Sequence, residues 1–262
     1  MGLLINNFFN SKYFDYLPNF VKRKLRKINS IYFILTKCKK LPNSNYNEPF
    51  SYSYQEFIIK NYKTSKYISK NSYKNLKKLI LKYNMSKNKI LDFGAGDINT
   101  YLDLIKLKNL KYYYYDINSR RIVINKIIKN FNLKNIFITK NPLIHKFNFI
   151  FFGSASGYIK NYKKILDKIV VSKCKFVLIS GIILFEKKNF KPYHVCCKQL
   201  NTLPRINYLY FFNKKKLLDF FKENDYEILF LKKNQFKKIS FKNLDFFSNN
   251  IEYVDILLKK KN

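Results

Sequence analysis

Two hydrophobic periods meet between residues 89 and 116. Residues 90–93 form a short apolar run, which predicts a buried parallel strand. Apolar residues then recur between 98 and 105 at the spacing of a helix with one buried face. A second apolar run covers residues 112–115 and ends at Asp116. This segment therefore predicts a β-strand, a helix and a second strand parallel to the first.

The rest of the chain repeats this alternation and predicts an α/β fold with a doubly wound, mostly parallel sheet of seven strands. Residues 50–87 read as helical, and 181–205 as a long irregular segment. The further strands are expected at 135–139, 147–152, 175–180, 226–231 and 252–258, and the further helices at 122–131, 162–169 and 213–224.

The turn after the first strand is Gly94-Ala95-Gly96. Glycine has no Cβ, so the backbone can bend sharply and lie against a ligand. The first amides of the following helix are expected to be unpaired and to suit an anionic group. Asp116, about 20 residues further on, stands where a carboxylate accepts hydrogen bonds from ribose hydroxyls. The layout predicts a nucleoside site; the plainer alternative is a structural turn in a ligand-free domain.

Two classes of cofactor share this layout. A dinucleotide site prefers G-x-G-x-x-G, and its last position here is Asn99. Asp92 lies two residues before Gly94, and a carboxylate there is unfavourable beside a pyrophosphate but favourable beside an ammonium group. The pattern favours a cofactor with an amino-acid end.

A second loop of small residues, 153–158, follows the strand expected at 147–152. Ligands of doubly wound sheets collect at the carboxyl ends of the strands, so Gly153 and Ser154 are candidate binding residues. Asn141 follows the strand at 135–139 and is a candidate near an adenine ring. The alternative for 153–158 is a plain strand-to-helix turn.

The segments 91–96, 151–159, 194–213 and 224–227 together resemble class I S-adenosylmethionine-dependent methyltransferases found among bacterial surface-polysaccharide genes. In 91–96 the D-x-G-x-G pattern is present, although Ile98 replaces the frequent third glycine. The resemblance covers residues 50–232 and implies a Rossmann-like fold, S-adenosyl-L-methionine as cofactor, and a small-molecule or glycan acceptor.

On this reading Asp116 holds the ribose, Asp92 lies near the ammonium group, and Ser154 borders the methionine pocket. Methyl transfer to a hydroxyl also benefits from a general base. The resemblance supplies no such base, so His194 is the first candidate and Glu186 the second. A loop histidine is more often merely solvated.

The net charge of +36 permits binding to nucleic acid, and an RNA methyltransferase or nucleic-acid-binding protein is one alternative function. The abundance of Lys, Asn, Ile, Phe and Tyr also follows from an AT-rich genome, which weakens that inference. A second alternative is a non-catalytic partner that keeps the methyltransferase fold.

Residues 1–45 are expected to form a basic helical arm, and residues 46–262 the methyltransferase-like domain, with 46–87 as a helical lead-in or lid. Within the arm, a basic run at 21–28 and an apolar run at 31–35 predict an amphipathic helix. Residues 21–40 could touch an anionic membrane; the alternative is a helix packed on the domain.

The four cysteines lack metal-ligand spacing, and with two histidines in the chain we expect no metal site and free thiols in a reducing cytoplasm. Neither a signal peptide nor an apolar run long enough to span a membrane is expected. The sequence thus predicts a cytoplasmic protein, with membrane-peripheral attachment as an option.

Overall fold

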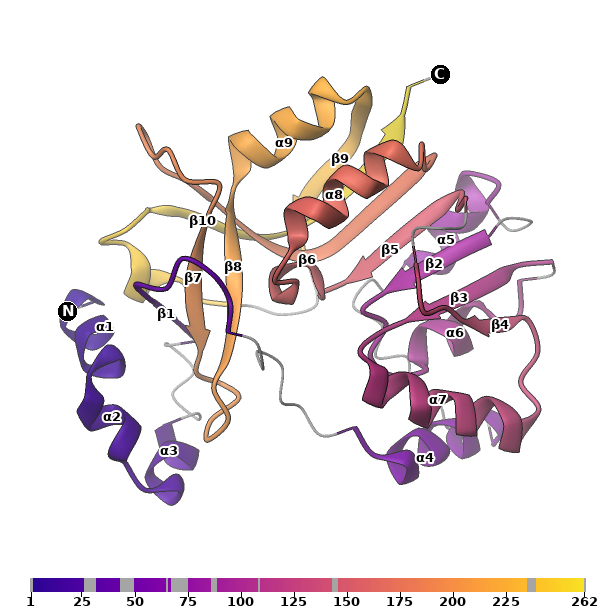
Figure 1. Ribbon diagram of the computed structural model, residues 1–262, viewed down its shortest axis with the longest axis horizontal. Coiled ribbons are helices and arrows are strands. Elements are labelled where there is room, and N and C mark those ends of the chain that lie inside the picture. The colour runs from indigo at the N-terminus through magenta and orange to yellow at the C-terminus, as the bar shows by residue number, and fades with distance from the viewer. Residues whose placement is uncertain are drawn as a thin grey trace.

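The computed structural model describes residues 2–25, 32–42, 50–64, 66, 75–85, 89–107, 109–142, 146–234 and 239–261. These residues form one mixed sheet with helices on both faces (Figure 1). The predicted doubly wound α/β fold is confirmed. The sheet has ten strands rather than seven, because three strands extend it beyond the expected core.

Five neighbouring strands of this core are parallel and run in the order β4-β3-β2-β5-β6. Strand β10 pairs antiparallel with β6, and β9 pairs antiparallel with β10. The bounds of these strands are β2 Lys89–Phe93, β3 Lys111–Tyr115, β4 Ile136–Ile138, β5 Phe149–Gly153, β6 Phe176–Glu186, β9 Tyr226–Lys233 and β10 Asn250–Lys260.

Two groups of helices cover this core. One face packs residues of α4, α5, α6 and α7 into a single apolar cluster with β2 and β3, and the other packs α8 and α9 against β5, β6 and β10. Figure 1 shows the two groups on opposite sides of the sheet. The bounds are α4 Tyr52–Lys63, α5 Leu76–Lys82, α6 Asn99–Leu104, α7 Asn118–Phe131, α8 Tyr162–Val171 and α9 Lys214–Glu223, with short 3-10 turns η1 Ser156–Tyr158 and η2 Lys242–Leu244.

The prediction that residues 181–205 are irregular is wrong. Strand β6 continues to Glu186, and a hairpin of β7 (His194–Gln199) and β8 (Asn207–Asn213) follows it. The end of β8 pairs in parallel with β6 at Leu184 and Phe185, beyond the point where β5 stops. The hairpin therefore extends the sheet past the carboxyl end of β5, which is the end where ligands of such sheets bind.

The amino-terminal segment also differs from its prediction. Three helices, α1 (Gly2–Asn10), α2 (Lys12–Tyr16) and α3 (Asn19–Leu25), precede strand β1 (Phe33–Leu35), which pairs antiparallel with β7. The apolar run expected inside a helix thus forms a buried edge strand instead. Residues 26–31, which include the end of the basic run, and residues 43–49 of the following loop lie outside the described residues.

A bulge interrupts β6 where the core meets the hairpin. Between two regular pairs with β10, Ser180 and Gly181 of β6 lie opposite the single residue Asp255. Gly181 has φ +65°, which glycine adopts at little cost, and its amide donates to Asp255 Oδ1 at 2.9 Å. Ile179 and Ile182 consequently face the same apolar cluster although they are three residues apart.

No helix among the described residues is long and apolar enough to cross a membrane.

Candidate functional site

The glycine loop has the backbone conformation that its sequence predicts. Gly94 and Gly96 have φ values of +70° and +66°, a region that residues with a Cβ rarely occupy. A Cβ on Gly94 would lie 2.5 Å from the Cβ of Ala155, so the loop after β2 touches the loop after β5. At Gly96 the nearest atom to such a Cβ is Arg120 Nη1 at 3.7 Å. The absence of a side chain at Gly94 thus lets the two loops touch. At Gly96 an added Cβ would make only an ordinary van der Waals contact.

Several amides of this loop and of the start of α6 already have partners, and the Asn99 amide, the first of the helix that was expected to be unpaired, donates to Asp97 Oδ1 at 3.0 Å. Those of Gly94 and Ala95 both donate to the carbonyl of Tyr115, at 2.8 and 3.1 Å. Ile98, the residue before α6, donates to the buried Gln55 side chain of α4 at 3.1 Å. An anionic group at these amides would have to replace protein acceptors.

Asp116 lies at the carboxyl end of β3, beside the glycine loop. Its Oδ2 accepts from the Gly96 amide at 2.7 Å and from Arg120 Nη1 at 3.3 Å, and its Oδ1 accepts from the Ile117 amide at 2.7 Å. A carboxylate has about four lone-pair sites, so Oδ1 keeps the capacity to accept another hydrogen bond. The guanidinium of Arg120 also lies 5.2 Å from the ring centre of Phe50. Asp116 is therefore the predicted residue whose position and remaining capacity suit a ribose hydroxyl.

Asp92 is held inside the fold rather than at the surface of the loop. Its side chain is buried between β2, β3 and α6, and the Tyr112 hydroxyl donates to Oδ2 at 2.5 Å. Burial raises the pKa of Asp92 to about 7, while the hydroxyls of Tyr112 and Thr100 oppose the rise. Of the two, only Tyr112 has hydrogen-bond geometry, and Oδ1 has no hydrogen-bond partner among the described residues. Contact between this carboxylate and a ligand ammonium group would need a rearrangement of the site.

Two tyrosines of β3 support the site, although the sequence analysis assigned them only to an apolar run. Tyr112 binds Asp92, and the Tyr114 hydroxyl donates to the Gly96 carbonyl at 2.6 Å. Both are buried, and they lie on the same face because side chains two apart in a strand share a face. Four successive tyrosines show no alternation, so only the predicted strand, which puts every second side chain on one face, could have pointed to this pair.

The loop after β5 brings a further group of polar residues together. Gly153 pairs with Ser180 at the end of β5, and Ser154 has φ +60°, unusual for a residue with a side chain. The Ser154 hydroxyl lies 3.2 Å from that of Tyr253 on β10. Both hydroxyls lie 2.4 Å from the place where a Cβ would stand on Gly181. Since Ala155 touches Gly94, this group is adjacent to the glycine loop.

Beneath these hydroxyls, Asp255 is buried and satisfied by protein donors. Its Oδ1 accepts from the Ser180 hydroxyl at 2.8 Å and from Asn234 Nδ2 at 2.6 Å, besides the Gly181 amide. These bonds fix the bulge, and the bulge fixes where Tyr253 points. Strained residues and bulges often gather at functional sites, which makes the Ser154–Tyr253 pair a candidate for contact with a ligand.

Asn141 lies in the turn that follows β4, and its side chain is exposed. The turn is joined to α7 by Arg121, whose Nη1 donates to the Thr139 carbonyl at 3.4 Å. The carboxyl end of β4 is on the same edge of the sheet as that of β3, which is compatible with the predicted adenine contact.

His194, the first candidate base, lies on β7 among aromatic rings rather than in a loop. Its Nδ1 is 2.9 Å from the Tyr162 hydroxyl and its Nε2 is 3.1 Å from the Lys39 carbonyl. Burial lowers the pKa of His194, so the ring is neutral at neutral pH. With Nε2–H donating to the carbonyl and Nδ1 accepting from the tyrosine, neither nitrogen is left to take a proton from an acceptor.

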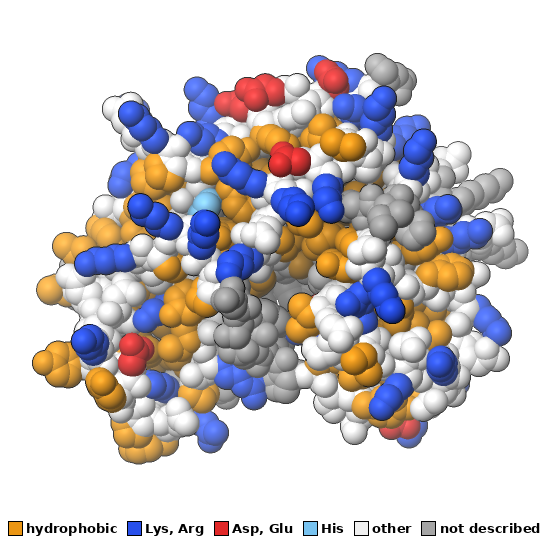
Figure 2. All heavy atoms as spheres, in the orientation of Figure 1, with side chains coloured by type: hydrophobic (Ala, Val, Ile, Leu, Met, Phe, Trp, Pro, Cys, Tyr) orange, Lys and Arg blue, Asp and Glu red, His pale blue; other side chains and the backbone are white. Residues whose placement is uncertain are grey.

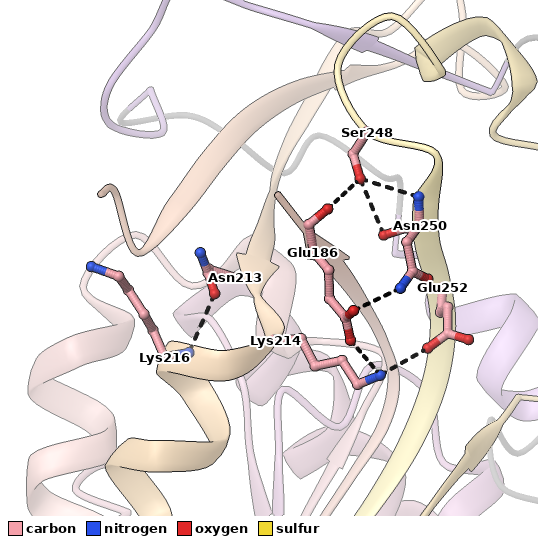
Figure 3. Close-up of polar contacts among 7 residues, drawn as sticks. All are labelled: Glu186, Asn213, Lys214, Lys216, Ser248, Asn250 and Glu252. Atoms are coloured by element: carbon pink, nitrogen blue, oxygen red, sulfur yellow. Dashed lines mark hydrogen bonds and ion pairs between the residues drawn. The ribbon is translucent and has the colours of Figure 1, made fainter. Parts of the chain in front are cut away.

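Glu186, the second candidate base, is the last residue of β6, far beyond the point where β5 ends. It is six residues beyond Ser180, roughly 20 Å along a strand. Figure 3 shows its carboxylate among polar groups of β10 and α9: Lys214 Nζ is 2.7 Å from Oε1, and Asn250 Nδ2 donates to Oε2 at 2.8 Å. Lys214 also lies 3.5 Å from Glu252, and Glu186 therefore has a structural partner that accounts for its charge.

An apolar cavity lies on the α8 and α9 face of the sheet. Its lining includes Phe152, Ile159, Ile182 and Leu217, with Ser156 and Tyr162 as the polar contributors. Such a lining does not suit a charged nucleoside, and we do not assign the cavity to the cofactor. No group of metal-ligating side chains occurs among the described residues. His145 lies outside those residues, so the statement does not cover it.

Comparison with known proteins identifies the fold. No family model matches the chain, and no curated protein matches it. Among solved structures, a coclaurine N-methyltransferase bound to N-methylheliamine and S-adenosylhomocysteine is 12% identical, with a TM-score of 0.51 over 94% of this chain and 89% of its own. The amino-terminal domain of EvdMO1 with S-adenosylhomocysteine and D-fucose is 8% identical, with a TM-score of 0.50 over 84% and 100%. At these identities the likeness shows the fold alone, which is that of class I S-adenosylmethionine-dependent methyltransferases.

Proposed function

We propose that the protein is a methyltransferase that uses S-adenosyl-L-methionine and acts on a hydroxyl group of a small-molecule or glycan acceptor. The observation that carries the proposal is the meeting of a left-handed glycine loop with Asp116 at the carboxyl ends of β2 and β3. Solved proteins of this fold have been crystallised with S-adenosylhomocysteine, together with N-methylheliamine in one case and D-fucose in another.

The residues fit this cofactor in part. Asp116 would accept from the ribose hydroxyls, and the missing Cβ of Gly96 would let the cofactor approach the main chain closely. Asn141 would border the adenine, and Gly153, Ser154 and Ala95 would line the methionine end. The cofactor supplies a sulfonium-bound methyl group, and the protein has to orient an acceptor in line with it.

The acceptor would lie against Ser154 and Tyr253. Burial raises the pKa of Tyr253, so its phenol stays protonated at neutral pH and serves as a hydrogen-bond partner rather than as a base. A hydroxyl acceptor could donate to one of the two hydroxyls and accept from the other, which would fix its direction of attack. A role in surface-polysaccharide synthesis is the finer part of the proposal and rests on the resemblance of residues 194–213.

The Tyr253→Phe variant tests this arrangement. We expect binding of S-adenosylhomocysteine to stay within about twofold of wild type, because the phenol lies on the acceptor side. Methyl transfer to D-fucose and a panel of other hydroxylated sugars, followed by mass spectrometry, should show a raised KM or loss of product. Tyr193→Phe is the matched control, since its hydroxyl donates to the Lys216 carbonyl on α9.

Equal transfer by Tyr253→Phe and wild type would contradict the acceptor position. Cofactor binding without transfer to any sugar or small alcohol would favour the non-catalytic alternative. Transfer to RNA alone, with an affinity that falls steeply with salt, would favour the nucleic-acid alternative.

A further inference from the structure

The amino-terminal helices carry apolar side chains on the face that points away from the rest of the protein. Leu4, Tyr13 and Tyr16 are 75%, 81% and 83% exposed, and more than half of Phe20 is exposed as well. Figure 2 shows hydrophobic side chains protruding from the lobe at the lower left, where Figure 1 places α1–α3. We define the arm patch as Leu3, Leu4, Phe8, Tyr13, Tyr16 and Phe20.

The inner face of α1 buries Phe9 beside the polar Asn6, so the helix has hydrophobic residues on two opposite sides. At about 100° per residue, Leu3, Leu4 and Phe8 fall on one side and the buried Asn6 and Phe9 on the other. An apolar face of a helix is normally covered by a neighbouring element. The outer side of α1 therefore lacks the contact that its composition suits.

The helices that carry the arm patch pack against the rest of the protein, which holds the patch in a fixed position. Phe9 and Phe14 pack with Ile34 of β1 and with Leu200 and Leu203 beyond β7. The Lys198 ammonium group donates to the Phe9 carbonyl at 3.2 Å. Adding a Cβ to Gly2 would place it 2.6 Å from the Asn243 carbonyl at η2, so the start of α1 is closely seated as well.

The charges around the patch select the kind of surface that would cover it. Residues 2–25 contain four basic side chains and one acidic side chain, Asp15. Lys12, Arg23 and Lys24 are exposed beside the apolar residues. Aliphatic tips, tyrosines and phenylalanines edged by lysine and arginine match the boundary between lipid headgroups and acyl chains. Leucine side chains gain little from contact with RNA, which is bound by charged and aromatic side chains. Separate apolar side chains that protrude from a surface insert more readily into a lipid layer than into a shaped protein groove.

We propose that α1–α3 dock the protein on an anionic lipid bilayer through the arm patch. This surface differs from the residues 21–40 expected from the sequence, because Phe33 and Ile34 of that range are buried in the sheet. The proposal is independent of the methyltransferase function: lipid binding needs neither the glycine loop nor Asp116.

Flotation with phosphatidylcholine vesicles, with and without phosphatidylglycerol, tests the proposal in the full-length protein. We expect wild type to float with the anionic vesicles and to float much less with neutral ones. The double variant Leu4→Ser/Phe20→Ser should lower the partition coefficient roughly tenfold or more, because two apolar side chains leave the lipid. The matched control is Phe57→Ser/Val171→Ser, which removes exposed apolar side chains of α4 and α8 and should float as wild type does.

The chain contains no tryptophan, so Phe8→Trp adds a single fluorescent reporter. Its emission should shift to the blue with anionic vesicles, while that of Phe57→Trp should not. High salt should weaken the binding but leave the reporter shift in the bound fraction. The proposal is overturned if the Leu4→Ser/Phe20→Ser variant floats like wild type, if the Phe8→Trp emission is unchanged, or if light scattering shows a dimer that the double variant disrupts.

Discussion

Replacing Asp92 by asparagine is expected to stabilise the protein at pH 8. The pKa of Asp92 is raised from 3.8 to about 7 by burial. A raised acid pKa means that the folded state holds the proton more tightly than the unfolded state. Stability is therefore lost as the pH rises from the unfolded to the folded pKa, and the full penalty, about 4 kcal/mol, is present above pH 7.

An asparagine at this position carries no charge and can still accept the Tyr112 hydroxyl hydrogen bond. The free energy of unfolding of Asp92→Asn should exceed that of wild type by several kcal/mol at pH 8, and the two should converge near pH 4. Urea unfolding at pH 4, 5, 6, 7 and 8 measures this difference. Wild type and variant share His194 and every titratable group other than Asp92. The difference between their free energies of unfolding therefore reports the titration of Asp92. A wild type more stable than the variant at pH 8 would show that the carboxylate is stabilised by a partner when ionised.

Replacing Asp116 by asparagine is expected to lower the affinity for S-adenosylhomocysteine by at least about a hundredfold. Hydrogen bonds to a charged group are worth about 1.5–3 kcal/mol each, and the ribose offers two hydroxyls to one carboxylate. The variant keeps the size of the side chain but replaces one acceptor oxygen by an NH₂ donor. Titration calorimetry of wild type and variant measures the change.

The same variant leaves Arg120 without its carboxylate, so its stability has to be followed alongside its affinity. Thermal unfolding measures the change in stability. We expect the variant to be less stable, because Asp116 and Arg120 form an ion pair in which both side chains are nearly buried. Asp167→Asn, an exposed aspartate of α8, is the matched control and should leave both quantities unchanged. An affinity within about threefold of wild type in a folded Asp116→Asn would remove the ribose role.

The local part of the fold was predictable from sequence because it is encoded within short segments. Between residues 89 and 116, a change of hydrophobic period and two glycines were enough to predict a strand, a glycine turn, a helix and a second strand. The structure has β2, α6 and β3 there. The positive φ values at Gly94 and Gly96 follow from the same pattern.

Contacts between distant segments were not predictable from the same evidence. Gln55 reaches the Ile98 amide from 43 residues upstream, and no local pattern marks that pairing. Strand β7 was expected to be irregular and β8 was not predicted, because both strands are short and gain their stability from pairing with distant strands, β7 with β1 and β8 with β6. Asp92 could be placed on a strand, but its burial depends on Tyr112 of the neighbouring strand.

Candidate bases were the weakest part of the sequence reading, for a physical reason. His194 and Glu186 were chosen by residue type within a segment expected to be a loop. In the structure each has close protein partners, Tyr162 and the Lys39 carbonyl for one and Lys214 for the other. The Ser154–Tyr253 pair depends instead on the Ser180–Gly181 bulge, which sets two residues against one. A glycine inside a strand pattern indicates a bulge but does not show which distant side chains it brings together.

The central claim is that the carboxyl ends of β2 and β3, at Gly96 and Asp116, seat a sulfonium nucleoside cofactor. Calorimetric titration of the wild-type protein with S-adenosylhomocysteine tests this claim most directly. We predict saturable single-site binding that ATP and NAD do not compete away. The absence of any saturable heat at millimolar ligand with folded protein, or equal competition by NAD, would contradict it.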